Sequence, residues 1–169
     1  LVSAVRMIHR HGLAVVGTFI AGFDADPPDV LRRQADFIQE AGIVMPKLWL
    51  LQAFPGTRLH RRVAREGRLR SNAIGEGTMN FSPRLDLSEL GRAYRETLAY
   101  IYGPEATRAR MRRFLEDYRP RALRRPAWRE LRIFARSLLR QGVMDGRHSL
   151  DYWRLLALVA RRAPGALAD

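Results

Sequence analysis

The sequence contains no cysteine and only one lysine, Lys47. Without cysteine, its 169 residues cannot form a disulfide, bind zinc or an iron–sulfur cluster through thiolates, or supply a cysteine nucleophile. No apolar run approaches the roughly 18 residues that a membrane-spanning helix needs. A P-loop, a Gly-x-Gly-x-x-Gly loop and a His-Glu-x-x-His helix are also missing. The sequence therefore predicts a globular chain without a self-sufficient catalytic constellation, and we expect it in the cytoplasm.

Positive charge is abundant and unevenly placed. The formal net charge is +13, and residues 104–169 hold 16 arginines against seven acidic residues. This asymmetry is typical either of a surface that binds nucleic acid or an anionic membrane, or of a solvated helical exterior. Because aromatic residues do not alternate with the arginines as in RNA- or DNA-binding modules, we expect no nucleic-acid partner. Peripheral membrane contact stays open as an alternative.

The first 70 residues alternate between strand and helix patterns. Residues 13–20 form a continuous apolar, β-branched run, which is typical of a strand buried on both faces. A helical stripe follows over residues 31–41, then a second apolar run over 47–53, and then a helix over 57–66. Short connections between such elements predict parallel strands joined by a crossover helix. Two strands cannot close a barrel, so we expect further strands upstream of Leu1.

The rest of the chain reads as helical. Residues 71–85 are rich in Gly, Ser, Asn and Pro and predict a connector. Asp86 to Glu89 resembles a capping box that begins one helix, and Pro104 begins another, with Met111, Phe114, Leu115 and Tyr118 on one face. Further helices are predicted from Pro126 and from Ser149. The predicted fold class is thus α/β followed by all-α, divided into residues 1–70, 71–85 and 86–169.

Two aspartates follow the first predicted strand. Asp24 and Asp26 together could bind a divalent cation, but no third oxygen ligand stands at a suitable spacing. Asp26 before Pro27 predicts a helix cap, and Asp24 predicts a turn residue. His9 and His11 are typical of favourable charge at a helix end. We therefore expect no metal site in this chain.

The ends of the two strands are the better site hypothesis. Gly22 and Asp24 follow the first strand, and Gln52 and Phe54 follow the second. Ligands of α/β sheets and barrels bind at the carboxyl ends of the strands. These residues are therefore predicted to share one binding surface.

Longer stretches resemble a known family. The segment "HGLAVVGTFIAGFDAD", followed by an apolar helix and "LWLLQAFPGTRLHRRVAREGRL", resembles the last two βα units of the radical S-adenosylmethionine barrel in proteins that also carry a cobalamin-binding domain. The continuation "TMNFSPRLDLSELGRAYRETLAYIYGPEATRARMRRFL" is similar to the helical domain of unknown function that follows the barrel in the subgroup that includes the hopanoid methylases. The resemblance covers about residues 8–115.

The resemblance implies a TIM-like barrel fragment from a cobalamin-dependent methyltransferase that acts on an unactivated carbon. It implies S-adenosylmethionine, a 4Fe-4S cluster and cobalamin as cofactors of the full-length protein, although the Cys-x-x-x-Cys-x-x-Cys cluster ligands are absent from this chain. By the same resemblance Ile20, Gly22, Gln52, Ala53 and Phe54 contact the nucleoside, and no catalytic side chain is assigned.

The chain alone is then not expected to be catalytically competent. Its expected partners are the N-terminal part of the same protein and a small-molecule substrate, with a lipid-like substrate as one option. The alternative is a non-catalytic basic helical module that binds nucleic acid or anionic membrane. We also expect the isolated chain to aggregate, because an incomplete barrel leaves strand edges unpaired.

Overall fold

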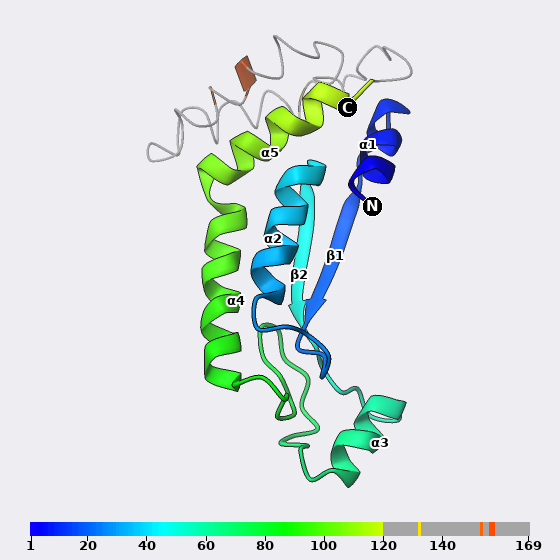
Figure 1. Ribbon diagram of the computed structural model, residues 1–169, viewed down its shortest axis with the longest axis vertical. Coiled ribbons are helices and arrows are strands. Elements are labelled where there is room, and N and C mark those ends of the chain that lie inside the picture. Colours follow the sequence, from blue (N-terminus) through cyan, green and yellow to red (C-terminus); the bar gives the residue numbers. More distant parts are fainter. Residues whose placement is uncertain (120–131, 133–152, 154–155, 158–169) are drawn as a thin grey trace. The chain divides into compact units, whose positions relative to one another are not determined.

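The structure of the chain is a computed structural model that describes residues 1–119, 132, 153 and 156–157. Its elements in chain order are α1 (Val2–Arg10), β1 (Val16–Ala21), α2 (Val30–Ala41), β2 (Met45–Leu50), α3 (Arg58–Arg65), α4 (Leu87–Tyr102) and α5 (Pro104–Asp117) (Figure 1). The helices predicted from Pro126 and Ser149 lie outside the described residues. The chain forms two compact units, one of Leu1–Val15, Gln39–Val44 and the segment from Pro104, the other of Val16–Ile38 and Met45–Gly103.

The predicted strands form a parallel pair. Val16 lies opposite Met45, and Ala21 lies opposite Leu50, with α2 as the connection between the strands. The predicted strand, helix, strand order is therefore confirmed, with strand bounds that differ by one to three residues from the predicted runs. This is the α/β part of the predicted fold class, followed by the helices α4 and α5.

The two faces of the sheet differ in burial, in contrast to the predicted strand buried on both faces. On one face Phe19, Leu48 and Leu50 are buried or half-buried, whereas on the other face Val16, Ile20, Met45 and Trp49 are exposed. The difference arises because the described residues supply helices to cover one face only. Four large apolar side chains thus lie on an open sheet face, which is unusual for a soluble surface.

The second unit has one hydrophobic core beneath the sheet. Residues from both strands, α2, α3, the segment after α3 and α4 contribute to it: Ala21, Leu31, Ala35, Leu48, Leu50, Val63, Met79, Phe81, Leu90, Tyr94 and Ile101. The predicted stripe of α4 therefore packs as expected, since residues three or four positions apart share one helix face. Met79 and Phe81 show that the predicted connector also supplies core side chains.

The first unit is built around α1 and α5. The predicted face of α5 is confirmed, because Phe114, Leu115 and Tyr118 form a buried cluster with Met111 packed against it. The ring of His9 meets Phe114 edge-on, with 4.9 Å between ring centroids. Asp117 of α5 accepts a hydrogen bond of 3.1 Å from Arg10 of α1. Aromatic packing and one shared carboxylate thus join the two helices.

Two of the helix starts are formed by side-chain caps. The Asp86 carboxylate accepts a 2.8 Å hydrogen bond from the amide of Glu89, which confirms that Asp86 begins α4 as its cap. The hydroxyl of Thr57 accepts from the amide of His60 and caps α3. Pro104 is the first residue of α5, as predicted.

The prediction that Asp26 caps a helix is wrong. The Asp26 carboxylate instead accepts hydrogen bonds from the amides of Gly22 and Phe23, at 2.8 and 2.9 Å, and α2 begins only at Val30. These two amides follow directly after β1 and need an acceptor, because no strand among the described residues pairs with them. Asp26 therefore closes the turn that ends the strand.

Candidate functional site

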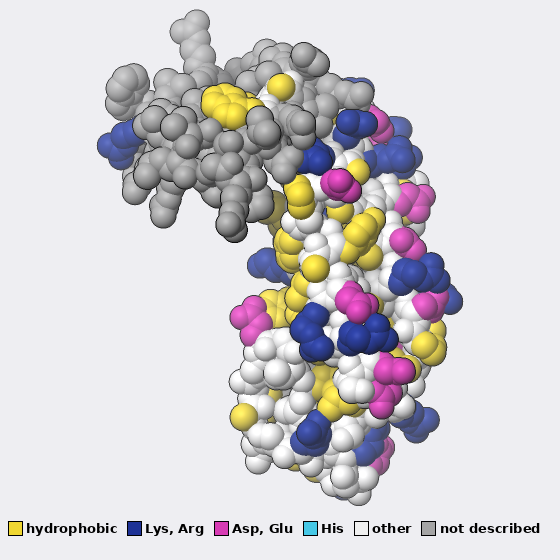
Figure 2. Space-filling view, turned by 90° about the vertical axis from the view of Figure 1, so that its left-hand side faces the viewer, with side chains coloured by type: hydrophobic (Ala, Val, Ile, Leu, Met, Phe, Trp, Pro, Cys, Tyr) yellow, Lys and Arg dark blue, Asp and Glu magenta, His cyan; other side chains and the backbone are white. Residues whose placement is uncertain are grey.

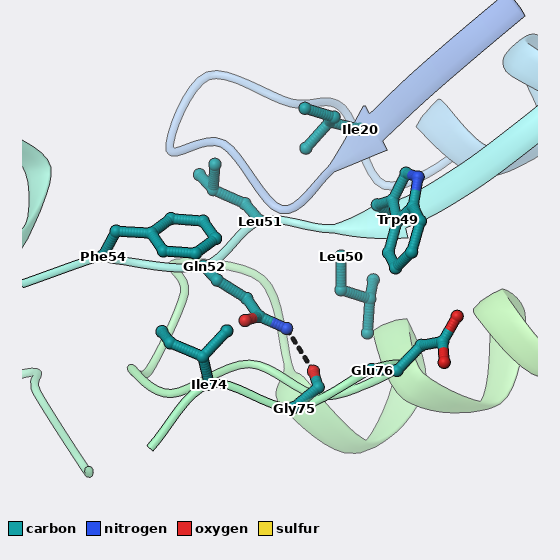
Figure 3. A pocket seen from close by; sticks show the side chains of 9 residues that line it. All are labelled: Ile20, Trp49, Leu50, Leu51, Gln52, Phe54, Ile74, Gly75 and Glu76. Carbon is teal, nitrogen blue, oxygen red and sulfur yellow. Dashed lines mark hydrogen bonds between the residues drawn. The ribbon is translucent and has the colours of Figure 1, made fainter. Parts of the chain in front are cut away.

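An open cavity of about 470 Å³ lies at the carboxyl ends of the two strands. It is lined by side chains from three segments: Ile20 of β1, residues 49–52 and Phe54 at the end of β2, and Ile74, Gly75 and Glu76 of the connector (Figure 3). The two strand ends meet here because parallel strands end at the same side of a sheet. The described part of the chain thus has a cavity at the strand ends, where the sequence analysis predicted a binding surface.

Three of the predicted site residues come together in this cavity. Ile20, Gln52 and Phe54 line it, whereas Gly22 and Ala53 do not. The connector segment from Ile74 to Glu76 supplies a wall that the sequence analysis missed, since this stretch has no periodic pattern. Trp49 was also missed, although its alternation with Leu48 and Leu50 indicates the face on which it lies.

The cavity wall is largely apolar. Ile20 is 40% exposed, Trp49 37% and Phe54 54%, so large hydrophobic surfaces face the open space rather than the core. Figure 3 shows Phe54 and Ile74 on one side of the space and Trp49 on the other. Apolar walls with a few polar groups are typical of small-molecule sites.

Gln52 and Glu76 are the two polar side chains among the residues that line this cavity. The amide nitrogen of Gln52 donates hydrogen bonds to the carbonyls of Gly75 and Thr78, which ties the connector to the end of β2 (Figure 3). Within the described residues its Oε1 is buried and has no hydrogen-bond partner. A buried acceptor without a partner costs free energy, so this atom suits a ligand that donates an N–H or O–H group.

Ala53 is held by a residue that the sequence analysis did not single out. The side chain of Asn80 accepts from the amide of Ala53 at 2.8 Å and donates to its carbonyl at 3.0 Å. Ala53 is fully buried, and both of its backbone groups are engaged in these two bonds. Ala53 therefore fastens the segment after β2 to Asn80 of the connector.

Gly22 does not line the cavity and lies against Met79. Its φ of +110° is a backbone conformation that residues with a side chain rarely adopt. A Cβ at this position would lie 2.8 Å from Cε of Met79. The positive φ is the main reason for glycine here, because Cε is the end of the flexible Met79 side chain and can move away from an added Cβ.

Asp24 forms ion pairs with two arginines. Arg68 binds both carboxylate oxygens, at 2.6 and 3.1 Å, and Arg62 of α3 binds Oδ2 at 2.9 Å. The hydrogen bond from Arg68 holds the pKa of Asp24 below its ordinary value, and the positive charges of Arg68, Arg62 and Arg84 act in the same direction. Asp24 lies in a turn, as predicted, but its ion pairs depend on residues 38 and 44 positions away.

The histidines do not converge on a site. His9 is fully buried, whereas His11 is exposed and bonds the carbonyl of Met7, and His60 bonds Asn72. No cluster of three or more His, Cys, Asp or Glu side chains suited to a metal occurs among the described residues. His148 lies outside them.

The described surface mixes charges of both signs. In Figure 2, Lys and Arg side chains stand beside Asp and Glu side chains rather than in a separate patch. Many of these arginines are paired, for example Arg32 and Arg33 with Asp29. In the part of the chain that the structure describes, no helix combines the length and the apolar character needed to cross a membrane.

Comparison with known proteins places this fold in a family. The model of the family described as domain of unknown function DUF4070 matches residues 57–169, which is more than half of the chain. The chain belongs to this family. No solved structure matches it significantly.

Three curated relatives carry methylase or methyltransferase names. The chain is 33% identical over 106 residues to the hopanoid C-2 methylase of Rhodopseudomonas palustris (strain TIE-1), covering 63% of this chain and 20% of the relative. It is 31% identical over 151 residues to the uncharacterized methyltransferase sll1242 of Synechocystis sp., covering 85% and 28%. It is 40% identical over 55 residues to the bacteriochlorophyllide d C-12(1)-methyltransferase of Chlorobaculum tepidum, covering 32% and 12%.

These comparisons confirm the resemblance to the hopanoid methylases and to a domain of unknown function. The chain spans less than a third of the length of each of the three relatives. Their names therefore describe longer polypeptides, of which this chain resembles one part.

Proposed function

We propose that the chain is the C-terminal part of a cobalamin-dependent radical S-adenosylmethionine methyltransferase, and that the cavity at the strand ends binds the nucleoside of S-adenosylmethionine. The observation that supports this most is the cavity itself, in which Ile20, Gln52 and Phe54 meet at the carboxyl ends of parallel strands. The methylase and methyltransferase names of the three relatives agree with methyl transfer as the reaction.

The described residues fit a nucleoside. Ile20, Trp49 and Phe54 offer apolar surface on which a flat base can pack and from which water is displaced. The unpartnered Oε1 of Gln52 can accept a hydrogen bond from an amino or hydroxyl group of that nucleoside. Bound there, S-adenosylmethionine supplies the methyl and adenosyl groups on which the reaction depends.

Asp24 does not take part in this proposed binding. Both of its carboxylate oxygens are engaged by Arg68, and Arg62 shares one of them. A sugar hydroxyl would have to displace a charge-assisted hydrogen bond to reach this carboxylate. Asp24 instead holds α3 and the following segment against the turn after β1.

The chain does not fit an iron–sulfur cluster. It contains no cysteine, and thiolates are the ligands that hold such clusters. In the proposed protein the cluster is therefore held by the part of the polypeptide that the relatives have in addition to the matched region, and we assign cobalamin to that part as well. The residues described here orient the nucleoside and exclude water, and they do not contact the redox centre through ligand bonds.

The proposed binding is tested by the Phe54→Ala variant of the full-length protein, with Tyr100→Ala as its control. Phe54 and Tyr100 are both 54% exposed, but only Phe54 lines the cavity. Loss of an aromatic wall should weaken S-adenosylmethionine binding about tenfold, as measured by isothermal titration calorimetry, because one aromatic contact contributes about 1–2 kcal/mol. The control should bind as the unmodified protein does.

Equal affinities for all three proteins would place the nucleoside elsewhere. Methyl transfer is measured separately, from labelled S-adenosylmethionine in the anaerobically reconstituted full-length protein. A coding sequence with an initiator methionine directly before Leu1 and no Cys-x-x-x-Cys-x-x-Cys upstream would refute the assignment to this enzyme class.

A further inference from the structure

A second cavity, of about 660 Å³, lies between β2, the connector and α4. Its lining includes Lys47 and Trp49 of β2, Glu76 of the connector, and Tyr94, Leu98 and Tyr102 of α4, which all belong to the second compact unit. Trp49 and Glu76 line both this cavity and the first one, and Figure 3 shows them on the side of the first cavity away from Phe54. The two cavities therefore adjoin.

Lys47 is the one positively charged side chain among the described residues that line the second cavity. It is also the single lysine of the chain, since every other basic residue among the 30 is arginine. Within the described residues no ion pair engages Lys47, whereas Arg62 and Arg68 are paired with Asp24. The described part of the chain thus presents a cation at the cavity wall without a fixed counter-charge.

The surroundings of Lys47 on the sheet are mostly apolar. Lys47 lies on the open face of the sheet between Met45 and Trp49, and its partner in the strand register is Thr18 of β1. When a ligand or another part of the polypeptide covers such a face, the ammonium group is removed from water. It then needs a negatively charged partner, because an unpaired charge in an apolar environment is costly.

The two tyrosines at this cavity do not donate hydrogen bonds to a ligand. The hydroxyl of Tyr94 donates to the carbonyl of Leu48 at 3.0 Å, and that of Tyr102 donates to the carbonyl of Pro46 at 2.8 Å. Burial raises the pKa of Tyr94, and the negative charge of Glu76 acts in the same direction. The proton therefore stays on the Tyr94 hydroxyl, and both rings offer mainly apolar surface to the cavity.

The charges of Lys47 and Glu76 define the class of ligand. One positive and one negative side chain line the cavity, so a ligand with a single negative charge is favoured over a dianion such as phosphate. The side chains of Trp49, Leu98 and Tyr102 favour an apolar body for the same ligand. A small apolar molecule with one carboxylate satisfies both conditions.

We propose that the second cavity binds a small apolar molecule that carries one carboxylate, that Lys47 binds this carboxylate, and that this molecule is the methyl acceptor. The acceptor role rests on the proposed function, because a molecule in the second cavity lies beside the nucleoside that we place in the first. Trp49 is the wall that the two ligands share. Lys47 is then a residue that determines substrate specificity.

The test uses fluorescence titration of the full-length protein with pyrenebutyrate and with its neutral analogue pyrenebutanol. Pyrenebutyrate should bind about tenfold more tightly, because its carboxylate gains a charge-assisted hydrogen bond. Lys47→Met should abolish this preference and leave the affinity for pyrenebutanol unchanged, which also shows that the cavity is intact. Lys47→Arg should retain the preference. The control is Arg95→Met, which removes one positive charge from an exposed position of α4 outside both cavities and should also retain it.

Equal affinities of the unmodified protein for the two probes would overturn the proposal, because Lys47 would then be paired with an acid of the same polypeptide. A preference that persists in Lys47→Met would overturn it as well. Glu76→Gln removes a repelling charge and should strengthen pyrenebutyrate binding about threefold. Weaker binding by this variant would contradict the assignment of the two charges.

The acceptor role requires that both ligands bind together. Saturating S-adenosylmethionine should change the affinity for pyrenebutyrate by no more than about threefold, and mutual exclusion would overturn the acceptor role. Lys47→Met should bind S-adenosylmethionine as the unmodified protein does, and Phe54→Ala should keep the preference for pyrenebutyrate.

The outcomes separate this proposal from the nucleoside proposal. A preference for pyrenebutyrate that depends on Lys47, together with unimpaired S-adenosylmethionine binding by Phe54→Ala, would retain the carboxylate site and refute the nucleoside cavity and the acceptor role. Weakened S-adenosylmethionine binding by Phe54→Ala without any preference for pyrenebutyrate would retain the nucleoside cavity and refute the carboxylate site.

Discussion

Arg68 binds both oxygens of Asp24, with Nη2 at 2.6 Å from Oδ1 and Nη1 at 3.1 Å from Oδ2. Both side chains are less than one-fifth exposed, 17% for Arg68 and 18% for Asp24. The pair joins the turn after β1 to the segment that follows α3. A two-point pair of this burial resists solvent screening better than the single-contact pairs on the helix surfaces.

Asp24→Asn should destabilise this region by about 1–2 kcal/mol, because it leaves Arg68 half-buried without its full counter-charge. Faster amide exchange in α3 and at residues 68–71 would show this loss of stability. The matched control is Asp36→Asn, whose carboxylate is 65% exposed and 3.6 Å from Arg32. The control should change stability by no more than about 0.5 kcal/mol. Equal effects of the two variants would contradict the special role of Asp24.

The stability of the α1–α5 unit should decrease as the pH falls below 6.5. Burial lowers the pKa of His9 from its ordinary value of 6.5, and the charge of Asp117 only partly opposes this effect. Below pH 6.5 His9 therefore binds a proton in the unfolded state but not in the folded state, so a falling pH favours unfolding. This effect continues until the pH reaches the lowered pKa of His9 in the folded state. This loss of stability is measured by amide exchange in α1 and α5 between pH 8 and pH 5.5. The exchange rates are corrected for the intrinsic effect of pH on exchange. His9→Gln should remove this dependence, and an unchanged dependence would exclude His9 as its source.

Gly22→Ala should destabilise the protein more than Gly56→Ala. Both glycines have a positive φ, +110° and +81°, so both variants incur backbone strain of about 1 kcal/mol. Only at Gly22 would the new Cβ collide, at 2.8 Å from Met79, whereas nothing lies within 4 Å at Gly56. Thermal unfolding of the two variants measures the difference. The addition of Met79→Ala to Gly22→Ala would show whether the collision is relieved.

Asn80→Ala should cost about 1–3 kcal/mol, because it leaves the buried N–H and C=O of Ala53 without partners. Asn72→Ala is the control, since Asn72 is exposed and bonds only the side chain of His60 in the described contacts. Chemical denaturation compares the two variants. A neutral Asn80→Ala would mean that water replaces the asparagine at Ala53.

The sequence predicted those features that depend on neighbours along the chain. The stripe of Met111, Phe114, Leu115 and Tyr118, the cap at Asp86 and the parallel strands all follow from local period and local hydrogen bonding. Asp26 was misassigned because a carboxylate before a proline can accept from amides that precede it or from amides that follow it. The sequence does not show which of these two hydrogen-bonding arrangements is more stable.

The candidate site was predictable only in part for a related reason. Ile20, Gln52 and Phe54 follow from the rule that strand ends meet, whereas the wall from Ile74 to Glu76 comes from a segment without period. Asn80 and Arg68 act on residues that are 27 and 44 positions away. Such contacts depend on how the connector folds back, which no local pattern specifies.

The amide of Asn80 does for Ala53 what one peptide unit of a neighbouring strand would do, since it both accepts from and donates to the same residue. The family match begins at residue 57, so Asn80 lies inside the matched region and Ala53 lies before it. The boundary of the family domain therefore cuts through a single hydrogen-bonded unit. A protein engineered to exchange this domain between relatives at residue 57 would have to carry over an asparagine that belongs, in physical terms, to the preceding strand.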